Sequence, residues 1–210
     1  MGAHGLNYNR NGVVAAPLST PSMTTRASGS SLLACVGRGV YADHVPPTDN
    51  KGNAYAQLGT GHTYKLWTSS GTALYACEQA VGGAGHVVTA AKRSAADETT
   101  LSVIEIANGG MVREVKWKEV LAGSPLTSQS VTTTGPAVIV AWWWGDAAEP
   151  SNKTAVPDNG FTVVDSILLS GALVQCAAAV RQVGAAGTYQ VTWTSTPLQG
   201  AQLWIAVVQA

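Results

Sequence analysis

Three consecutive tryptophans are the residues whose chemistry first suggests a binding site. The stretch Ala137–Asp146 reads AVIVAWWWGD, and Trp142, Trp143 and Trp144 are three of the seven tryptophans in the chain. Planar rings with a polar group beside them bind sugars, and Asp146 supplies a nearby carboxylate. Large apolar side chains in a strand are more often packing groups, because they are usually buried.

The spacing of these rings indicates that the strand needs cover on both faces. Side chains alternate along a strand, so Trp142 and Trp144 share one face while Trp143 lies on the other. Both faces are otherwise apolar and must be covered by an opposing sheet, an N-terminal arm, a loop or another subunit. We therefore expect protein contacts at Trp142, Trp143, Trp144 and Asp146, with a glycan site at the same residues as the alternative.

A second candidate is the stretch Asp49–Asn53, with the sequence DNKGN. Carboxylate and amide oxygens at alternate positions suit a calcium ion, but the rest of an EF-hand loop and its terminal glutamate are missing. Asn and Gly tolerate the left-handed conformation of a tight hairpin. We interpret this stretch as a hairpin turn and expect no metal there.

The remaining metal-ligand residue types are scattered. Cys35, Cys77 and Cys176 lie in apolar runs without CxxC spacing, which indicates buried reduced thiols. The histidines also lack the spacing of metal ligands. We interpret them as side chains that are exposed to solvent or hydrogen-bonded within the protein: His4, His44, His62 and His86.

Catalytic motifs are also missing from the sequence. It contains neither a Gly-x-Ser-x-Gly nucleophile elbow nor a phosphate-binding or dinucleotide-binding glycine motif. Its carboxylate pairs, Asp146 with Glu149 and Asp158 with Asp165, are typical of loops and strands. We expect a protein that is not an enzyme and has neither catalytic residues nor a cofactor.

The composition limits the class of partner. Hydrophobic residues make up 46% and charged residues 11%, and twelve basic residues balance twelve acidic ones. A basic patch for nucleic acid is therefore not expected, and no apolar run is long enough for a membrane span. A surface with few charges has little repulsion between neighbours, which favours dense packing in an assembly.

The chain pattern predicts an all-β fold, an antiparallel jelly-roll-like sandwich. Residues 1–25 are expected to form an extended N-terminal arm, and residues 26–210 a single sandwich domain. Short runs rich in Val, Ile, Thr, Tyr and Trp alternate with Gly, Pro, Asn and Asp clusters. The predicted strands are 31–39, 54–59, 63–69, 73–81, 86–92, 101–107, 130–134, 137–144, 161–169, 173–183, 188–195 and 202–210. A further half-exposed strand is indicated by Val115 and Trp117 alternating with charged residues.

Two similar strand sets, at about 29–107 and 135–210, indicate an internal duplication. GSSLLACVGRG at residues 29–39 aligns with GPAVIVAWWWG at residues 135–145, which places Val36 on Trp142. ALYACEQAV aligns with ALVQCAAAV, placing Cys77 on Cys176, and the run starting at Leu101 aligns with the run starting at Leu203.

The succession TDNKGNAY, TYKLW, LYAC, GGAGHVVTA, LSVIEI, VPDNGFTVVDS and AGTYQVTWTS resembles a β-sandwich module of phage virion structural proteins and bacterial extracellular proteins. The resemblance covers residues 24–210 and implies a fold and a setting rather than a reaction. Secreted members carry a signal peptide, and the start MGAHGLNYN lacks its pattern.

These observations together predict a non-enzymatic structural protein of a bacteriophage particle, assembled in the host cytoplasm and located in the virion. Capsid decoration is the first expectation within that class, and a tail or fibre component is the second. Expected partners are a major capsid or tail protein and further copies of the chain, and neither nucleic acid nor a membrane. The alternative is an extracellular carbohydrate-binding or adhesive module.

Overall fold

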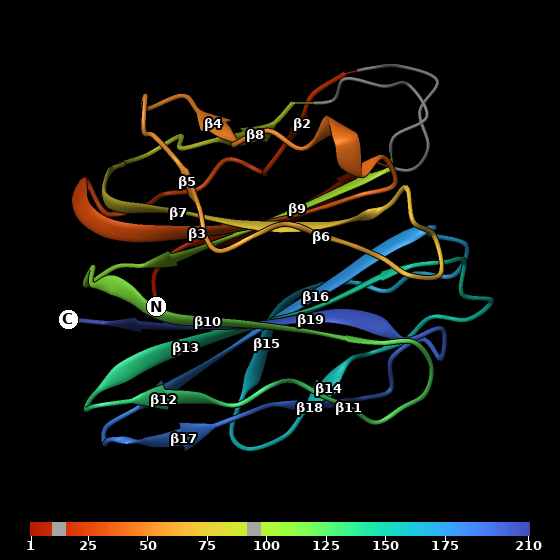
Figure 1. The fold of residues 1–210 in the computed structure, drawn as a ribbon. Helices are drawn as coiled ribbons and strands as arrows, with labels where there is room; N and C mark the ends of the chain where they lie inside the picture. The colour runs from red at the N-terminus through yellow and green to blue at the C-terminus, as the bar shows by residue number, and fades with distance from the viewer. Residues whose placement is uncertain (10–15, 92–97) are drawn as a thin grey trace. The chain divides into compact units, whose positions relative to one another are not determined.

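The computed structural model describes residues 1–9, 16–91 and 98–210, and its sheets are antiparallel throughout (Figure 1). The all-β prediction is confirmed. In the described ranges the one helical element is a short 3-10 turn, η1 (Tyr41–Asp43). None of the described residues belongs to a helix with the length and hydropathy of a membrane span.

The chain divides into two compact units, and the first unit is Met1–Gly110. Its main sheet has the order β1 (His4–Asn9), β9 (Thr99–Ile106), β3 (Ser28–Arg38), β7 (Gly71–Val81) and β5 (Ala56–Gln57), and β6 (His62–Thr63) also pairs with β7. A smaller sheet has the order β2 (Leu18–Ser19), β8 (Val88–Ala90) and β4 (Thr48–Asp49). An isolated bridge joins Met23 to His86.

The second unit is Met111–Ala210. Its main sheet has the order β10 (Met111–Val120), β19 (Ala201–Gln209), β13 (Ala137–Asp146), β16 (Val174–Val183) and β15 (Thr162–Ile167). Two smaller sheets contain β11 (Leu126–Thr127), β18 (Thr192–Thr194) and β14 (Val156–Pro157), and β12 (Val131–Thr133) with β17 (Gly187–Tyr189). The half-exposed strand predicted around Val115 and Trp117 is β10.

Each unit is a two-layered sandwich with its own apolar core. In the first unit Leu32 and Val103 of the main sheet pack with Leu18 and Val88 of the smaller sheet. The core of the second unit joins residues of β13, β16 and β19 to Leu126, Val131 and Trp193 of the smaller sheets. Alternation along each strand therefore sends every second side chain into its unit's core.

The two units repeat one strand order. The first main sheet has the order β1, β9, β3, β7, β5, and the second has the corresponding order β10, β19, β13, β16, β15. The smaller sheets correspond in the same way, with β2, β8, β4 in the first unit and β11, β18, β14 in the second. The Met23 to His86 bridge takes the place of the β12 and β17 pair. The shared order is what a duplicated sequence would produce, and the duplication itself stays a prediction.

The pairing registers change the residue alignment between the two strand sets. Val36 lies opposite Ala73 and Leu101, whereas Trp143 lies opposite Ala177 and Leu203. Trp143 is therefore the counterpart of Val36, and the alignment of Val36 with Trp142 is wrong by one residue. The correspondence of Leu101 with Leu203 agrees with these registers.

The alignment of Cys77 with Cys176 is also wrong. Cys77 faces the core of the first unit, but Cys176 lies opposite Trp144, on the face of the second main sheet that points away from that unit's core. Short runs of Ala and Val look alike in either register, so sequence similarity alone does not fix which face they occupy.

The N-terminal arm and the segment 63–69 differ from their predictions. Part of the predicted arm is strand, because β1 pairs with β9 and β2 pairs with β8. The end of the predicted strand 86–92 lies outside the described residues. The prediction of one continuous strand over 63–69 is wrong. β6 ends at Thr63, and a turn follows in which Trp67 accepts a hydrogen bond from Ser70 N–H at 2.9 Å.

Small residues make room for the tryptophans of β13. Trp142 and Trp143 lie opposite Ala178 and Ala177 of β16, so the large rings face short side chains across the sheet. Gly145 lies close to the ring of Trp143, and a methyl group added there would come within 2.6 Å of the Trp143 Cη2 atom. The end of β13 therefore requires a residue without a side chain.

We predict that Gly145→Ala destabilises the protein by about 1–3 kcal/mol, because an added methyl overpacks a buried ring. Urea unfolding followed by tryptophan fluorescence measures this change. The matched control is Gly184→Ala, since nothing lies within 4 Å of a methyl group at Gly184. Equal stability of the two variants would contradict the close packing of Trp143.

Candidate functional site

The tryptophans predicted to contact a partner or a glycan are buried. Trp142, Trp143 and Trp144 have 0% exposed surface. Trp143 packs in the core of the second unit, and Trp142 and Trp144 lie on the opposite face of the main sheet. A sugar or a partner would reach these rings only after the strand is uncovered, so their role as contact residues stays a prediction.

The rings belong to a wider arrangement of tryptophans across the main sheet. Trp204 of β19 lies between Trp117 of β10 and Trp142 of β13, opposite both. Directly opposed aromatic side chains on neighbouring strands stabilise a sheet by roughly 0.2–1 kcal/mol per pair. Asp146 ends β13 half-buried, opposite Val174. The arrangement accounts for the tryptophans as packing groups that hold neighbouring strands together.

The stretch predicted to be a hairpin turn is organised by the carboxylate of Asp49. Its Oδ1 atom accepts hydrogen bonds from the backbone N–H groups of Lys51 at 2.9 Å and Asn53 at 3.0 Å. Its Oδ2 atom accepts from Asn53 Nδ2 at 2.7 Å and the Tyr55 hydroxyl at 2.9 Å, and lies 3.0 Å from His86 Nε2. The oxygens that a calcium loop would need are therefore engaged by protein donors.

His86 links Asp49 to a hydroxyl, in the residue order of a catalytic triad but with the two ring nitrogens exchanged. Its Nδ1 atom lies 2.9 Å from Thr25 Oγ1, on the side of the ring opposite Asp49. The side chains of His86 and Asp49 are 0% exposed, and the Thr25 oxygen also accepts the Gly83 N–H at 3.1 Å. A buried hydroxyl occupied in this way has no approach for a substrate, so the chain of hydrogen bonds serves to join β4 to the Met23 to His86 bridge.

The cysteines and the metal-ligand residues form no centre in the structure. The described cysteines are free and buried, and burial raises the pKa of the Cys35 and Cys77 thiols. Among the described residues, no group of three or more His, Cys, Asp and Glu side chains could hold a metal ion. Buried thiols with raised pKa values are poor nucleophiles at neutral pH.

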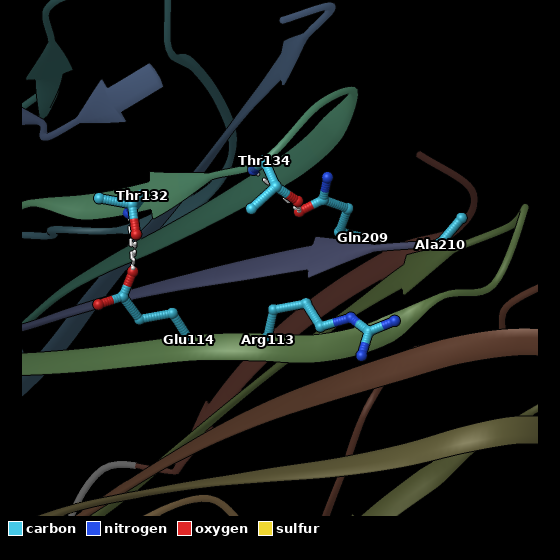
Figure 2. A pocket seen from close by; sticks show the side chains of 6 residues that line it. All are labelled: Arg113, Glu114, Thr132, Thr134, Gln209 and Ala210. Carbon is cyan, nitrogen blue, oxygen red and sulfur yellow. Dashed lines mark hydrogen bonds between the residues drawn. The ribbon is translucent and has the colours of Figure 1, made fainter. Parts of the chain in front are cut away.

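A groove of about 450 Å³ follows the edge strand β10 in the second unit. Figure 2 shows its lining side chains, which are Arg113, Glu114, Thr132, Thr134, Gln209 and Ala210. Glu114 reaches across to β12 and accepts the N–H of Thr132 at 2.7 Å and its hydroxyl at 3.0 Å. These bonds and Lys116, whose Nζ atom lies 3.2 Å from Glu114 Oε1, lower the pKa of Glu114.

Gln209 and Arg113 are further polar side chains of the groove. Gln209 Oε1 accepts from the N–H and the hydroxyl of Thr134, at 3.4 and 3.3 Å, which leaves its amide nitrogen for other partners. Arg113 is exposed and, among the arginines that the structure describes, alone lacks a hydrogen bond, ion pair or ring contact. The groove therefore holds one cationic side chain, Arg113, together with the carboxylate of Glu114.

Several exposed apolar residues lie on loops that sequence reasoning overlooked, and others, such as Val81 of β7, lie on strands. Leu66 and Trp67 follow β6 in the first unit, with 47% and 45% exposure. Leu121 and Leu198 lie in two loops of the second unit that are joined by a hydrogen bond from Gly123 N–H to the Leu198 carbonyl at 2.9 Å. We call Leu121 and Leu198 the leucine patch. The available signal was the cluster of small and polar residues after Trp67, TSSG, which marks a turn.

Comparison with known proteins returned no match for this chain among family models, curated proteins or solved structures.

Asp49 predicts a pH dependence of stability. Burial raises its pKa, but the hydrogen bonds from Asn53, His86 and Tyr55 outweigh burial and hold the pKa at about 2. Because this value lies below that of an unfolded aspartate, about 3.9, the carboxylate stabilises the fold above about pH 4. We expect on the order of 2 kcal/mol of stability to be lost as the pH falls from about 4 to about 2.

Asp49→Asn is expected to remove most of this dependence and to lower stability at pH 7 by a similar amount. Urea unfolding at a series of pH values measures both effects. Asp158→Asn is the matched control, because Asp158 is also followed by Asn and Gly but is exposed. An unchanged acid slope in Asp49→Asn would show that Asp49 is not the organising group.

Proposed function

We propose that this chain is a non-enzymatic structural protein of a bacteriophage particle and works through protein-protein packing. Capsid decoration is the role we favour, and a tail or fibre component is the next. The proposed partners are a major capsid or tail protein and further copies of the chain, and the proposed location is the virion, after assembly in the host cytoplasm. The phage setting rests on the sequence resemblance, and the mode of action rests on the surface.

The observation that carries the mode of action is the leucine patch on a chain with few charges. Leu198 is 63% exposed and Leu121 is 42% exposed, in loops that touch each other. Full burial of an exposed leucine contributes roughly 1.5–3 kcal/mol, and burying the exposed part of each of these leucines in a contact contributes about half of that. Since only 11% of the residues are charged, such a contact meets little electrostatic opposition.

The environment of the polar side chains also supports the proposal of a non-enzymatic role. Asp49, His86 and Thr25 have the residue types of a hydrolase triad, but they are enclosed and hydrogen-bonded to the surrounding loops. The open groove beside β10 holds a carboxylate, Glu114, that is already bound by three donor groups. Neither place offers a free base next to an accessible nucleophile, which supports a role in binding or assembly.

A carbohydrate-binding or adhesive module is the second candidate. The specific observation in its favour is the exposed indole of Trp67, since the tryptophans of β13 are enclosed.

Sedimentation velocity over a range of protein concentrations tests the packing proposal. We expect reversible association that persists at about 1 M salt, where exposed charge pairs are screened. The double variant Leu121→Ser with Leu198→Ser is expected to weaken association about tenfold or more.

Val81→Ser is the matched control, because Val81 is exposed on β7 of the first unit, whereas the leucine patch belongs to the second unit. A chain that stays monomeric at every concentration, and does not bind particles made from the capsid or tail genes beside its own, would overturn the proposal.

A further inference from the structure

We propose that the loop between β6 and β7 binds a hexopyranose ring of a glycan on the indole of Trp67. The proposal deepens the second candidate function and does not depend on the leucine patch. It moves the glycan site from Trp142–Trp144 of the second unit to a loop of the first unit (Figure 1).

The loop is held in place by backbone hydrogen bonds. Tyr64 N–H donates to the Ser70 carbonyl at 2.9 Å and closes the loop at its base. The Trp67 carbonyl accepts both the N–H and the hydroxyl of Ser70, at 2.9 and 2.8 Å. Tyr41 of η1 ties the loop from outside by donating its N–H to Ser69 at 2.5 Å. A fixed loop loses little conformational entropy when a ligand binds.

The indole of Trp67 is supported on one side and exposed to solvent. It stacks on Tyr64, with ring centroids 5.8 Å apart and planes inclined by 14°. Tyr64 is fully buried, so the supporting ring is fixed in the fold, while 45% of Trp67 remains exposed. All seven tryptophans lie in the described ranges, and Trp67 is the one tryptophan with this much exposed surface.

The surroundings of the ring supply polar groups. Thr63, Lys65, Thr68 and Ser69 are exposed along the same loop. The hydroxyl of Tyr41 lies close to Gly61, just before β6, where a methyl group would overlap it. The neighbours of Trp67 in the sequence therefore carry hydroxyl and ammonium groups, which are the kind of polar groups that sugar sites combine with an apolar platform.

The residues of the loop favour a sugar over an apolar side chain of a protein partner. The face of an aromatic ring carries negative charge in its quadrupole and attracts the C–H groups of a pyranose. Here the exposed apolar surface is limited to Leu66 and Trp67, and polar residues flank it on both sides in the sequence.

Binding of labelled protein to an array of mono- and oligosaccharides tests the proposal. Saturation-transfer NMR with methyl glycosides of glucose, galactose, mannose and N-acetylglucosamine then measures the contact directly. We expect Trp67→Ala to weaken binding about tenfold or more and Trp67→Phe to retain most of it. Leu198→Ala is the matched control, since it removes an exposed apolar side chain in the other unit.

Absence of glycan binding would overturn the proposal, as would equal binding by Trp67→Ala. Thermal unfolding checks that the variant is folded, which we expect because the ring is exposed. Loss of self-association in Trp67→Ala without glycan binding would identify the loop as a protein contact and would also overturn the proposal. The leucine-patch variants separate the two functions, because they should lose association and keep any glycan binding.

Discussion

The burial of strand β13 is the constraint on which the second unit depends. A strand at the centre of a five-stranded sheet, with neighbours on both edges and side chains buried on both faces, has no surface to give to a ligand. Its three tryptophans fit because β16 presents alanines opposite two of them and because Gly145 carries no side chain. The residues that look most like a binding platform in the sequence are therefore among the least accessible in the fold, and we propose that contacts with other molecules come from the loops.

The buried polar side chains of the first unit also serve the fold. The carboxylate of Asp49 gathers donors from its own turn, from Tyr55 and from His86, and the histidine carries the connection on to Thr25. An ionised carboxylate can remain buried at such a place because each of its oxygens is hydrogen-bonded. The shared strand order of the two units indicates that the sandwich itself does not need this network, since Tyr189 pairs with Val131 where His86 pairs with Met23. The hydrogen bonds of Asp49, His86 and Thr25 therefore fix the Asp49–Asn53 turn in the first unit.

Periodicity and turn residues in the sequence were enough to predict the fold class and most of the strands. β10, for example, follows from the alternation of Val115 and Trp117 with charged residues. It was harder to predict which face of the sheet each residue occupies, because runs of Ala and Val permit a shift of one residue. Val36 was aligned with Trp142, whereas its counterpart in the structure is Trp143. The position of Trp67 was missed because TYKLW has the composition of a strand, although TSSG follows it and hydrogen bonds at Ser70 and Tyr41 form a loop there. The Asp49 network depends on residues far apart in sequence, which no local pattern brings together.

The central claim is that buried tryptophans serve the fold and that exposed loops make the contacts. Hydrogen–deuterium exchange, measured by mass spectrometry on the free chain and on the chain in its assembled form, tests it most directly. The account predicts that residues 137–146 exchange slowly in both forms, and that protection gained on assembly falls on the loops around Leu121 and Leu198. Rapid exchange of residues 137–146 in the free chain, followed by strong protection there on assembly, would contradict it.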